Sequence, residues 1–319
     1  MSMAATPPAE AAQEPIPPGA PIGVLGAGLM GHAIAYLFAR AGHEVRVHDP
    51  SPAAIAALPD RLAQIARLLG DGPAVAARVR AADSLEAAVA GAGCVIEAAP
   101  EDAGLKRELF ARIEAAAPAG AILASNTSAI PIATIAGQLR SRARVVGMHF
   151  WNPPYLVPLV EVVQMAEENL PAVRRAMALL RAAGRHPVHV RRDIPGFIGN
   201  RLQHALKREA IALVAAGVCD AETIDDVVKL GFGRRMAVLG PMEQSDLVGL
   251  DLTRRIHEVL MPDLDRTPHP HPYLVALVEG GRLGMRTGQG FRSWTDEEAE
   301  AVRERLRRAL LADIAAARG

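Results

Sequence analysis

Short apolar runs alternate with longer stretches of helical character from Pro21 to about Val190. The apolar runs have the length and composition of buried strands. They are Ile22–Leu25, Glu44–His48, Cys94–Ala98, Ile122–Ala124, Val145–Met148 and Leu159–Val163. The stretches with helical character include the segment that ends at Ala41, Lys106–Ala116 and Pro171–Ala183. This alternation predicts a doubly wound parallel sheet with helices on its faces.

The alternation stops after Arg192–Gly196, and the rest of the chain reads almost wholly as helix. The predicted helices are Phe197–Ala216, Ala221–Leu230, Pro241–Leu260, Tyr273–Glu279 and Asp296–Ala316. We therefore predict an α/β fold, with a Rossmann-type domain over residues 21–193 and an all-helical domain over residues 194–319. Residues 1–20 are rich in Ala and Pro and are predicted to be a disordered tail.

Composition favours a small-molecule partner. The 319 residues suit about two domains, and 35 Lys and Arg balance 35 Asp and Glu. A net charge of zero gives no electrostatic footprint for nucleic acid or an acidic membrane surface, and no apolar run reaches the ~18 residues of a membrane span. The two cysteines, Cys94 and Cys219, match no zinc or CxxC spacing. We expect neither a metal nor a disulfide, and a reducing cytoplasm fits.

A glycine-rich turn, GAGLMG, follows the first predicted strand and opens a helix, which is the context of a dinucleotide site. Its cofactor-contacting residues are predicted to be Gly26, Gly28, Leu29, Met30 and Gly31. Asp49 ends the second predicted strand, where a carboxylate suits the adenosine ribose hydroxyls and repels a 2′-phosphate. We therefore expect NAD rather than NADP. The alternative is that the glycines only form a turn and Asp49 caps a helix before Pro52.

His149 and Glu161 are the strongest candidates for acid–base chemistry. His149 comes at the end of a predicted strand, where doubly wound folds place their ligands. Glu161 lies inside the apolar run Leu159–Val163, and a buried acid is costly unless it is paired. A carboxylate on one ring nitrogen leaves the other nitrogen as a base. The alternative is that His149, one of ten histidines, is a structural residue.

Three further polar groups are not needed by a strand-and-helix scaffold. Ser125–Ser128 follows a predicted strand, although such residues also cap helices. Glu101 and Lys106 follow another strand and lie within reach of a bound cofactor, or form a solvated pair. Asn200 lies one turn into a helix past Pro195, and is either a hydrogen-bond donor to a developing oxyanion or simply exposed.

The ordered motifs GAGLMG, SNTSAIPI, HFWNP, PGFIGNRL and GMRTGQGFRSW resemble the L-3-hydroxyacyl-CoA dehydrogenase family. The likeness extends from Ile22 to Trp294. It implies a Rossmann domain and a helical domain that forms a homodimer, with NAD oxidising a 3-hydroxy group to a ketone in fatty acid metabolism.

The resemblance also implies a role for each matching residue. His149 would be the general base and Glu161 the acid that orients it. Ser128 would contact the substrate hydroxyl, Asn200 would bind near the reacting group, and Asn152 would shape the substrate pocket. Glu101 and Lys106 would contact the nicotinamide ribose.

Two departures from the family leave the substrate open. The stretch between Asp49 and Asp83 is shorter and poorer in lysine than in members that use acyl-CoA. Gly231–Pro241 is longer and more basic, as in lambda-crystallin relatives that act on free hydroxy acids. Arg235 is therefore either a bidentate partner for a substrate carboxylate or a surface residue. The remaining alternative, a non-catalytic NAD-binding or structural protein, has no need for an intact His149 and Glu161.

Overall fold

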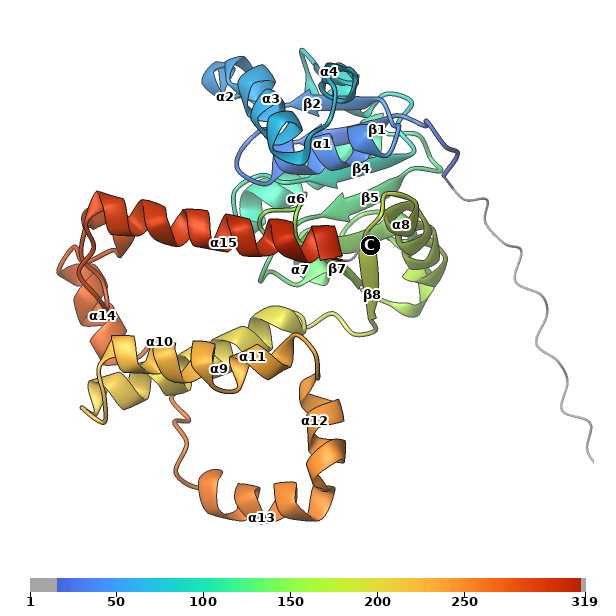
Figure 1. Ribbon diagram of the computed structural model, residues 1–319. Coiled ribbons are helices and arrows are strands. Elements are labelled where there is room, and N and C mark those ends of the chain that lie inside the picture. Colours follow the sequence, from blue (N-terminus) through green and yellow to red (C-terminus); the bar gives the residue numbers. More distant parts are fainter. Residues whose placement is uncertain (1–15, 317–319) are drawn as a thin grey trace, which may run out of the picture. The chain divides into compact units, whose positions relative to one another are not determined.

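The computed structural model describes residues 16–316 (Figure 1). Most of the predicted tail, residues 1–15, lies outside the described residues. The chain divides into two compact units, which meet between Asn200 and Arg201. Among the described residues, no helix combines the length and apolar character that crossing a bilayer requires.

The first unit contains one eight-stranded sheet in the order β3-β2-β1-β4-β5-β6-β7-β8. Its strands are β1 (Ile22–Leu25), β2 (Val45–His48), β3 (Val79–Ala81), β4 (Cys94–Glu97), β5 (Ile122–Ser125), β6 (Val145–Phe150), β7 (Leu159–Val163) and β8 (His186–Val190). The strands from β3 to β6 in that order are parallel, as predicted. β7 is antiparallel to β6 and parallel to β8, so the sheet is mostly parallel, with one antiparallel pair that the sequence did not predict. Only residues 151–158 connect β6 to β7, too few for the crossover that parallel strands need.

Helices cover both faces of this sheet (Figure 1). They are α1 (Gly31–Arg40), α2 (Pro52–Ala56), α3 (Leu58–Leu69), α4 (Pro73–Ala76), α5 (Leu85–Val89), α6 (Ala103–Ala116), α7 (Ile132–Ala136) and α8 (Leu170–Ala182). The buried side chains of α1, α3 and α8 share one apolar cluster, and those of α5, α6 and α7 share the other. Because the central strands are buried on both faces, they read as continuous apolar runs rather than as alternating patterns.

Several helices and strands differ from the prediction. The edge strand β3 has only three residues, and β8 carries two histidines and a proline, so neither was predicted. Helix α6 begins at Ala103 rather than Lys106, because the Asp102 carboxylate accepts the Leu105 N–H and caps it. The predicted helix Pro241–Leu260 is two helices, broken at Gly249, whose φ of +98° a helix cannot accommodate.

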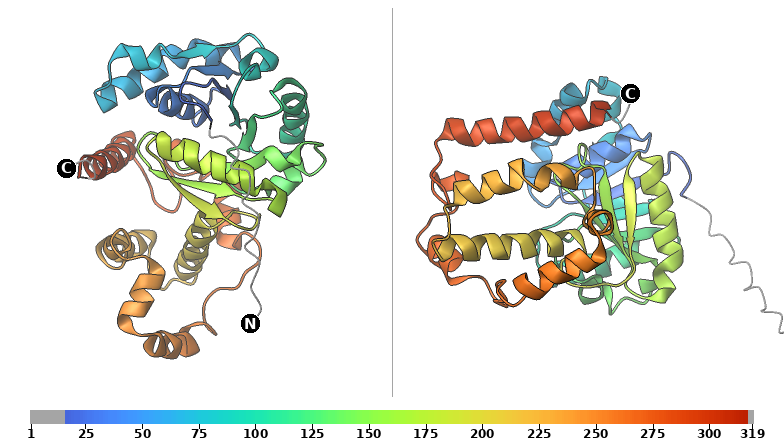
Figure 2. Two further views of the ribbon diagram at one scale, coloured as in Figure 1. Left: turned by 90° about the vertical axis from the view of Figure 1, so that its right-hand side faces the viewer. Right: turned by 60° about the horizontal axis from the view of Figure 1, so that its bottom comes forward.

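The second unit is helical, as predicted, and Figure 2 shows its helices from two further directions. They are α9 (Gly199–Ala215), whose first residues belong to the first unit, α10 (Ala221–Leu230), α11 (Gly233–Met236), α12 (Pro241–Val248), α13 (Leu250–Leu260), α14 (Pro272–Glu279) and α15 (Asp296–Ala316). Among residues 201–314, the buried hydrophobic side chains are Leu277 and Ala299. This unit therefore exposes most of its apolar side chains.

Candidate active site

His149 and Glu161 are directly opposite each other on the antiparallel strands β6 and β7. The His149 Nδ1 atom lies 2.8 Å from the Glu161 Oε2 atom, and the two residues are 4% and 1% exposed. The other carboxylate oxygen, Oε1, accepts the N–H groups of Ile198 at 2.9 Å and Gly199 at 3.0 Å. Hairpin register and the start of α9 together give this buried acid the partners that it requires.

Electrostatics keep the Glu161 carboxyl ionised. Burial acts to raise its pKa, but the hydrogen bonds from His149, Gly199 and Ile198 outweigh burial and hold the pKa below the usual range. An ionised Glu161 accepts a hydrogen bond from His149 Nδ1–H, which leaves the lone pair of Nε2 available as a base.

Aromatic rings enclose the imidazole of His149. The ring of Trp151 lies 5.4 Å from it and that of Phe197 lies 5.7 Å from it, between centroids. Phe197 is fully buried and adopts a φ of +49°, a strained value for a residue with a side chain. This conformation directs the next two backbone N–H groups to Glu161. Gly199 lies against the Trp151 ring, which leaves no room for a side chain.

The glycine-rich loop between β1 and α1 fits a dinucleotide on steric grounds. Gly26 has a φ of +106°, and a Cβ there would lie 2.6 Å from the Ala98 carbonyl oxygen. A Cβ on Gly31 would overlap the Gly26 carbonyl oxygen. A Cβ on Gly28 would meet nothing within 4 Å, so this glycine faces open space, where a pyrophosphate would need to approach the backbone. Leu29 is 67% exposed in the same loop, and Met30 immediately precedes α1.

Asp49 is linked to this loop rather than to a helix. Its Oδ2 atom accepts the Ala27 N–H at 2.7 Å and its Oδ1 atom accepts the Ser51 N–H at 2.8 Å. Ser51, not Asp49, caps the following helix α2 through the Ala54 N–H. The helix-cap alternative for Asp49 is therefore wrong. The acid lies beside the glycine-rich loop, where a carboxylate is needed to bind the hydroxyls of the adenosine ribose.

Arg61 is a neighbour of this loop that the sequence did not reveal. It extends from α3 and donates from Nη1 to the Ala27 carbonyl oxygen at 2.8 Å. The adjacent Gly28 carbonyl oxygen lies 2.6 Å from Nδ1 of His32. The stretch between Asp49 and Asp83 is rich in Ala and contains several arginines, so the sequence gave no reason to single out Arg61.

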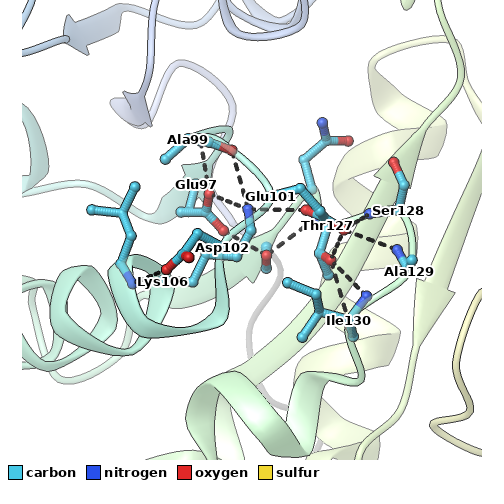
Figure 3. A network of polar contacts seen from close by, with 12 residues as sticks. Glu97, Ala99, Glu101, Asp102, Lys106, Thr127, Ser128, Ala129 and Ile130 are labelled. Carbon is cyan, nitrogen blue, oxygen red and sulfur yellow. Dashed lines mark hydrogen bonds and ion pairs between the residues drawn. The ribbon is translucent and has the colours of Figure 1, made fainter. Parts of the chain in front are cut away.

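Glu101 links the loops that follow β4 and β5 (Figure 3). Its Oε1 atom accepts the Thr127 hydroxyl at 2.6 Å and the N–H groups of Ser128 and Ala129, both at 3.0 Å. The Ser128 carbonyl oxygen in turn accepts a hydrogen bond from Asn200 Nδ2 at 2.8 Å. The side chain of Ser128 is exposed at the end of this chain of contacts. Asn200 is thus held against the Ser128 turn.

Lys106 is buried, so the alternative of a solvated Glu101–Lys106 pair is wrong. Its side chain is 1% exposed, and Nζ lies 2.7 Å from Oε1 of Glu97 and 3.5 Å from Oε2 of Glu101. Glu97, the last residue of β4, is fully buried and also accepts the Ser125 hydroxyl at 2.6 Å. The sequence reasoning missed Glu97, although an acid that ends an apolar strand was a usable signal.

The polar segment after β5 does not cap a helix. Asn126 Oδ1 accepts the Phe150 N–H at 2.9 Å and so ties this segment to β6. Ser125 and Thr127 bond to the two glutamates, while α7 starts later, at Ile132. The helix-cap alternative for Ser125–Ser128 is therefore wrong.

The last two predicted substrate residues are both exposed. Asn152 is exposed in the loop after β6. Arg235 is exposed on α11 of the second unit. Within residues 16–316, no group of three or more His, Cys, Asp or Glu side chains is arranged to hold a metal ion.

Comparison with known proteins assigns both halves of the chain. Residues 21–194 match the family model "3-hydroxyacyl-CoA dehydrogenase, NAD binding domain", and residues 196–294 match "3-hydroxyacyl-CoA dehydrogenase, C-terminal domain". A probable 3-hydroxybutyryl-CoA dehydrogenase of Bacillus subtilis is 39% identical over 86% of this chain and 97% of its own. An L-carnitine dehydrogenase of Streptomyces coelicolor is 42% identical over 72% of this chain and 73% of its own.

A solved structure also aligns with nearly the whole chain. It is the NAD⁺-dependent 5-formyl-3-hydroxy-2-methylpyridine 4-carboxylic acid 5-dehydrogenase, with 34% identity and a TM-score of 0.87. The alignment covers 94% of this chain and 98% of that one. The fold class predicted from the sequence, the family resemblance and the NAD cofactor are confirmed.

Gly28→Val tests the cofactor loop. Because a Cβ at this position meets nothing within 4 Å, the midpoint of thermal unfolding should not change. NADH affinity should fall about tenfold or more, as the added side chain occupies the place of the pyrophosphate. Fluorescence titration with NADH measures this effect. Gly120→Val, also in open space but before β5, is the control and should leave both quantities unchanged. Wild-type affinity in Gly28→Val would contradict the assignment.

Proposed function

Because this chain belongs to the 3-hydroxyacyl-CoA dehydrogenase family, we propose that it oxidises the hydroxyl of a 3-hydroxyacyl-CoA, or of a similar 3-hydroxy acid, to a ketone. The observation that carries this proposal is the buried pair of His149 and Glu161 at 2.8 Å. A neutral imidazole with one nitrogen held by a carboxylate is the arrangement that removes a proton from an alcohol.

In the proposed reaction, His149 Nε2 takes the hydroxyl proton, and Glu161 stabilises the imidazolium that results. NAD, when bound, accepts the hydride that leaves the carbinol carbon. General-base assistance of this kind contributes about 10²–10⁴ to the rate. The aromatic rings of Trp151 and Phe197 limit the access of water to the imidazole.

The other predicted residues receive roles in binding and positioning. Ser128 contacts the substrate hydroxyl, and Asn200, held against the Ser128 carbonyl oxygen, lies beside the reacting group. Asn152 helps to shape the substrate pocket. Glu101, half-exposed at the same edge of the sheet, binds the nicotinamide ribose, with Lys106 behind it. Fixed donors of this kind raise the rate by holding the reacting groups in one geometry.

His149→Ala tests the general base. NAD reduction should fall by about 10²–10⁴, the contribution of such a base, while NADH affinity stays close to wild type. Steady-state kinetics and NADH titration measure the two effects. The exposed histidine His186 on β8 supplies the control, and His186→Ala should leave turnover unchanged.

Undiminished turnover in His149→Ala would exclude His149 as the general base. Absence of turnover in the wild type with every hydroxy substrate would favour the non-catalytic alternative.

A second candidate substrate is a free hydroxy-carboxylate. The chain is similar both to a 3-hydroxybutyryl-CoA dehydrogenase and to an L-carnitine dehydrogenase, and carnitine carries a free carboxylate rather than a CoA thioester. The basic segment Gly231–Pro241 supports this alternative, because the guanidinium of Arg235 is able to bind a carboxylate through two parallel hydrogen bonds.

Kinetics with matched substrates separate the two classes. The rate of NADH formation is measured with 3-hydroxyacyl-CoA esters and with the corresponding free hydroxy acids. If the carboxylate class is right, free acids give the higher kcat/KM, and Arg235→Ala removes that preference, a loss of about tenfold or more. Arg234→Ala, at the neighbouring exposed arginine, is the control and should leave the preference for free acids unchanged. A preference for CoA esters that Arg235→Ala leaves unchanged would exclude Arg235 as the carboxylate partner.

We also propose that the helical domain forms a homodimer. Of the large hydrophobic side chains that are exposed among the described residues, all but Leu29, Leu105 and Ile198 lie at residue 202 or beyond. In the second unit, α9 and α10 line one side of an apolar cavity of about 420 Å³. Exposure on this scale is typical of a surface that a second protein covers, and a second copy is the commonest partner.

Sedimentation velocity tests the dimer. At micromolar concentration the protein should sediment with twice the chain mass of 33.7 kDa. Val259→Asp, at a side chain 74% exposed on α13, should weaken association, because it places a charge on an apolar surface. Arg254→Gln, at an exposed side chain on the same helix, is the control and should leave association unchanged. A wild-type monomer at this concentration would contradict the proposal.

Domain limits and location follow the same reasoning. We place the NAD-binding domain at residues 21–193 and the substrate and dimerisation domain at 194–319, which accords with family models that match 21–194 and 196–294. We expect the enzyme to work in the cytoplasm, where its free cysteines stay reduced.

A further inference from the structure

A carboxylate that the proposed reaction does not use lies at the end of the central strand β4. Glu97 is fully buried, and three donors surround it. Lys106 Nζ and the Ala99 N–H each lie 2.7 Å from Oε1 (Figure 3). The Ser125 hydroxyl lies 2.6 Å from Oε2. The donors come from the loop after β4, from α6 and from β5. Glu97 therefore joins three separate segments of the first unit.

The contacts of Lys106 extend this connection toward Glu101 and the Ser128 turn, where cofactor and substrate are proposed to bind. Besides Glu97, its ammonium donates to the Ala99 carbonyl oxygen at 3.2 Å and lies 3.5 Å from Glu101 Oε2. The other oxygen of Glu101 holds the Thr127 hydroxyl and the N–H groups of Ser128 and Ala129. A continuous series of polar contacts thus runs from Glu97 through Lys106 and Glu101 to the Ser128 turn.

Stability alone gives little reason to keep this pair. A buried ion pair is costly to desolvate, and apolar residues of similar volume often stabilise a fold equally well. The neighbouring strand illustrates the point, because Leu25 is paired with Glu97 in the sheet register and ends β1 with an apolar side chain. The exposed fractions of the two charged neighbours of Lys106 also differ. Glu101 is 40% exposed and able to reach a ligand, whereas Glu97 is not exposed at all.

We propose that Glu97 is a positioning residue, which acts through Lys106 to fix Glu101 and the turn from Thr127 to Ala129 for cofactor and substrate. This inference rests on the proposed roles of Glu101 and Ser128. It gives different roles to Glu101 and Lys106, which the family resemblance places together at the nicotinamide ribose. Glu101 touches the ligand, and Lys106 holds Glu101 in place from inside the fold.

The test separates positioning from stability with paired substitutions. Glu97→Gln alone leaves the Lys106 ammonium without its main counter-ion, so the midpoint of thermal unfolding should fall. Glu97→Gln combined with Lys106→Met removes both charges and should restore most of that midpoint. NADH affinity should nevertheless stay reduced by about tenfold, because Glu101 has lost the ammonium that holds it. Glu101→Gln should weaken NADH binding to a similar degree.

The exposed ion pair of Glu86 and Arg112, also anchored on α6, supplies the matched control. Glu86→Gln combined with Arg112→Met likewise removes both charges of an ion pair, but outside the network, and should leave NADH affinity unchanged. Wild-type affinity in the Glu97–Lys106 double variant, with weakened binding in Glu101→Gln, would overturn the positioning role. Wild-type affinity in Glu101→Gln would instead refute the cofactor role given to Glu101 in the proposed function.

Discussion

A carboxylate buried in a sheet needs a hydrogen-bond donor for each of its oxygens, and this requirement is met at two places in the sheet of the first unit. Glu161 takes its donors from His149 on β6 and from the backbone that opens α9. Glu97 takes its donors from Lys106, Ala99 and Ser125. Each acid therefore binds together segments that are distant in sequence, and the polar groups of the site belong to the elements so connected.

Glu161 and Glu97 have different effects on the groups around them, because the side chains that donate hydrogen bonds to them differ. Glu161 accepts a hydrogen bond from the His149 imidazole, so its negative charge determines which nitrogen of His149 carries the proton. Glu97 is paired with Lys106, and both side chains of this pair are buried inside the fold. In the roles proposed above, the first arrangement makes a base, while the second supports a loop. Keeping chemistry and support on separate carboxylates allows the base to change its protonation state without disturbing the loop that holds Ser128.

The sequence predicted the features that depend on local pattern and on the cost of an unpaired charge. β1, β7, α10 and α15 have their predicted bounds, and Glu161 was matched to His149 because an acid inside an apolar strand requires a partner. The same argument applied to Glu97, which lies inside the predicted strand Cys94–Ala98 but was not singled out. β3 and β8 lacked an apolar run, and the contact from Arg61 to Ala27 depends on the packing of α3, which no local pattern records.

The residues proposed to carry the reaction and the residue proposed to select a carboxylate substrate lie in different parts of the chain. His149, Glu161, Ser128 and the glycine loop all lie before residue 200, and the chemistry of hydroxyl oxidation requires nothing more specific than these groups. Relatives named for a CoA ester and for carnitine are similarly close to this chain, so overall identity does not separate the substrate classes. Selectivity between a thioester and a carboxylate must then come from groups that recognise charge away from the reacting carbon. In this chain the segment Gly231–Pro241, with two adjacent exposed arginines, is the part whose charge suits that discrimination.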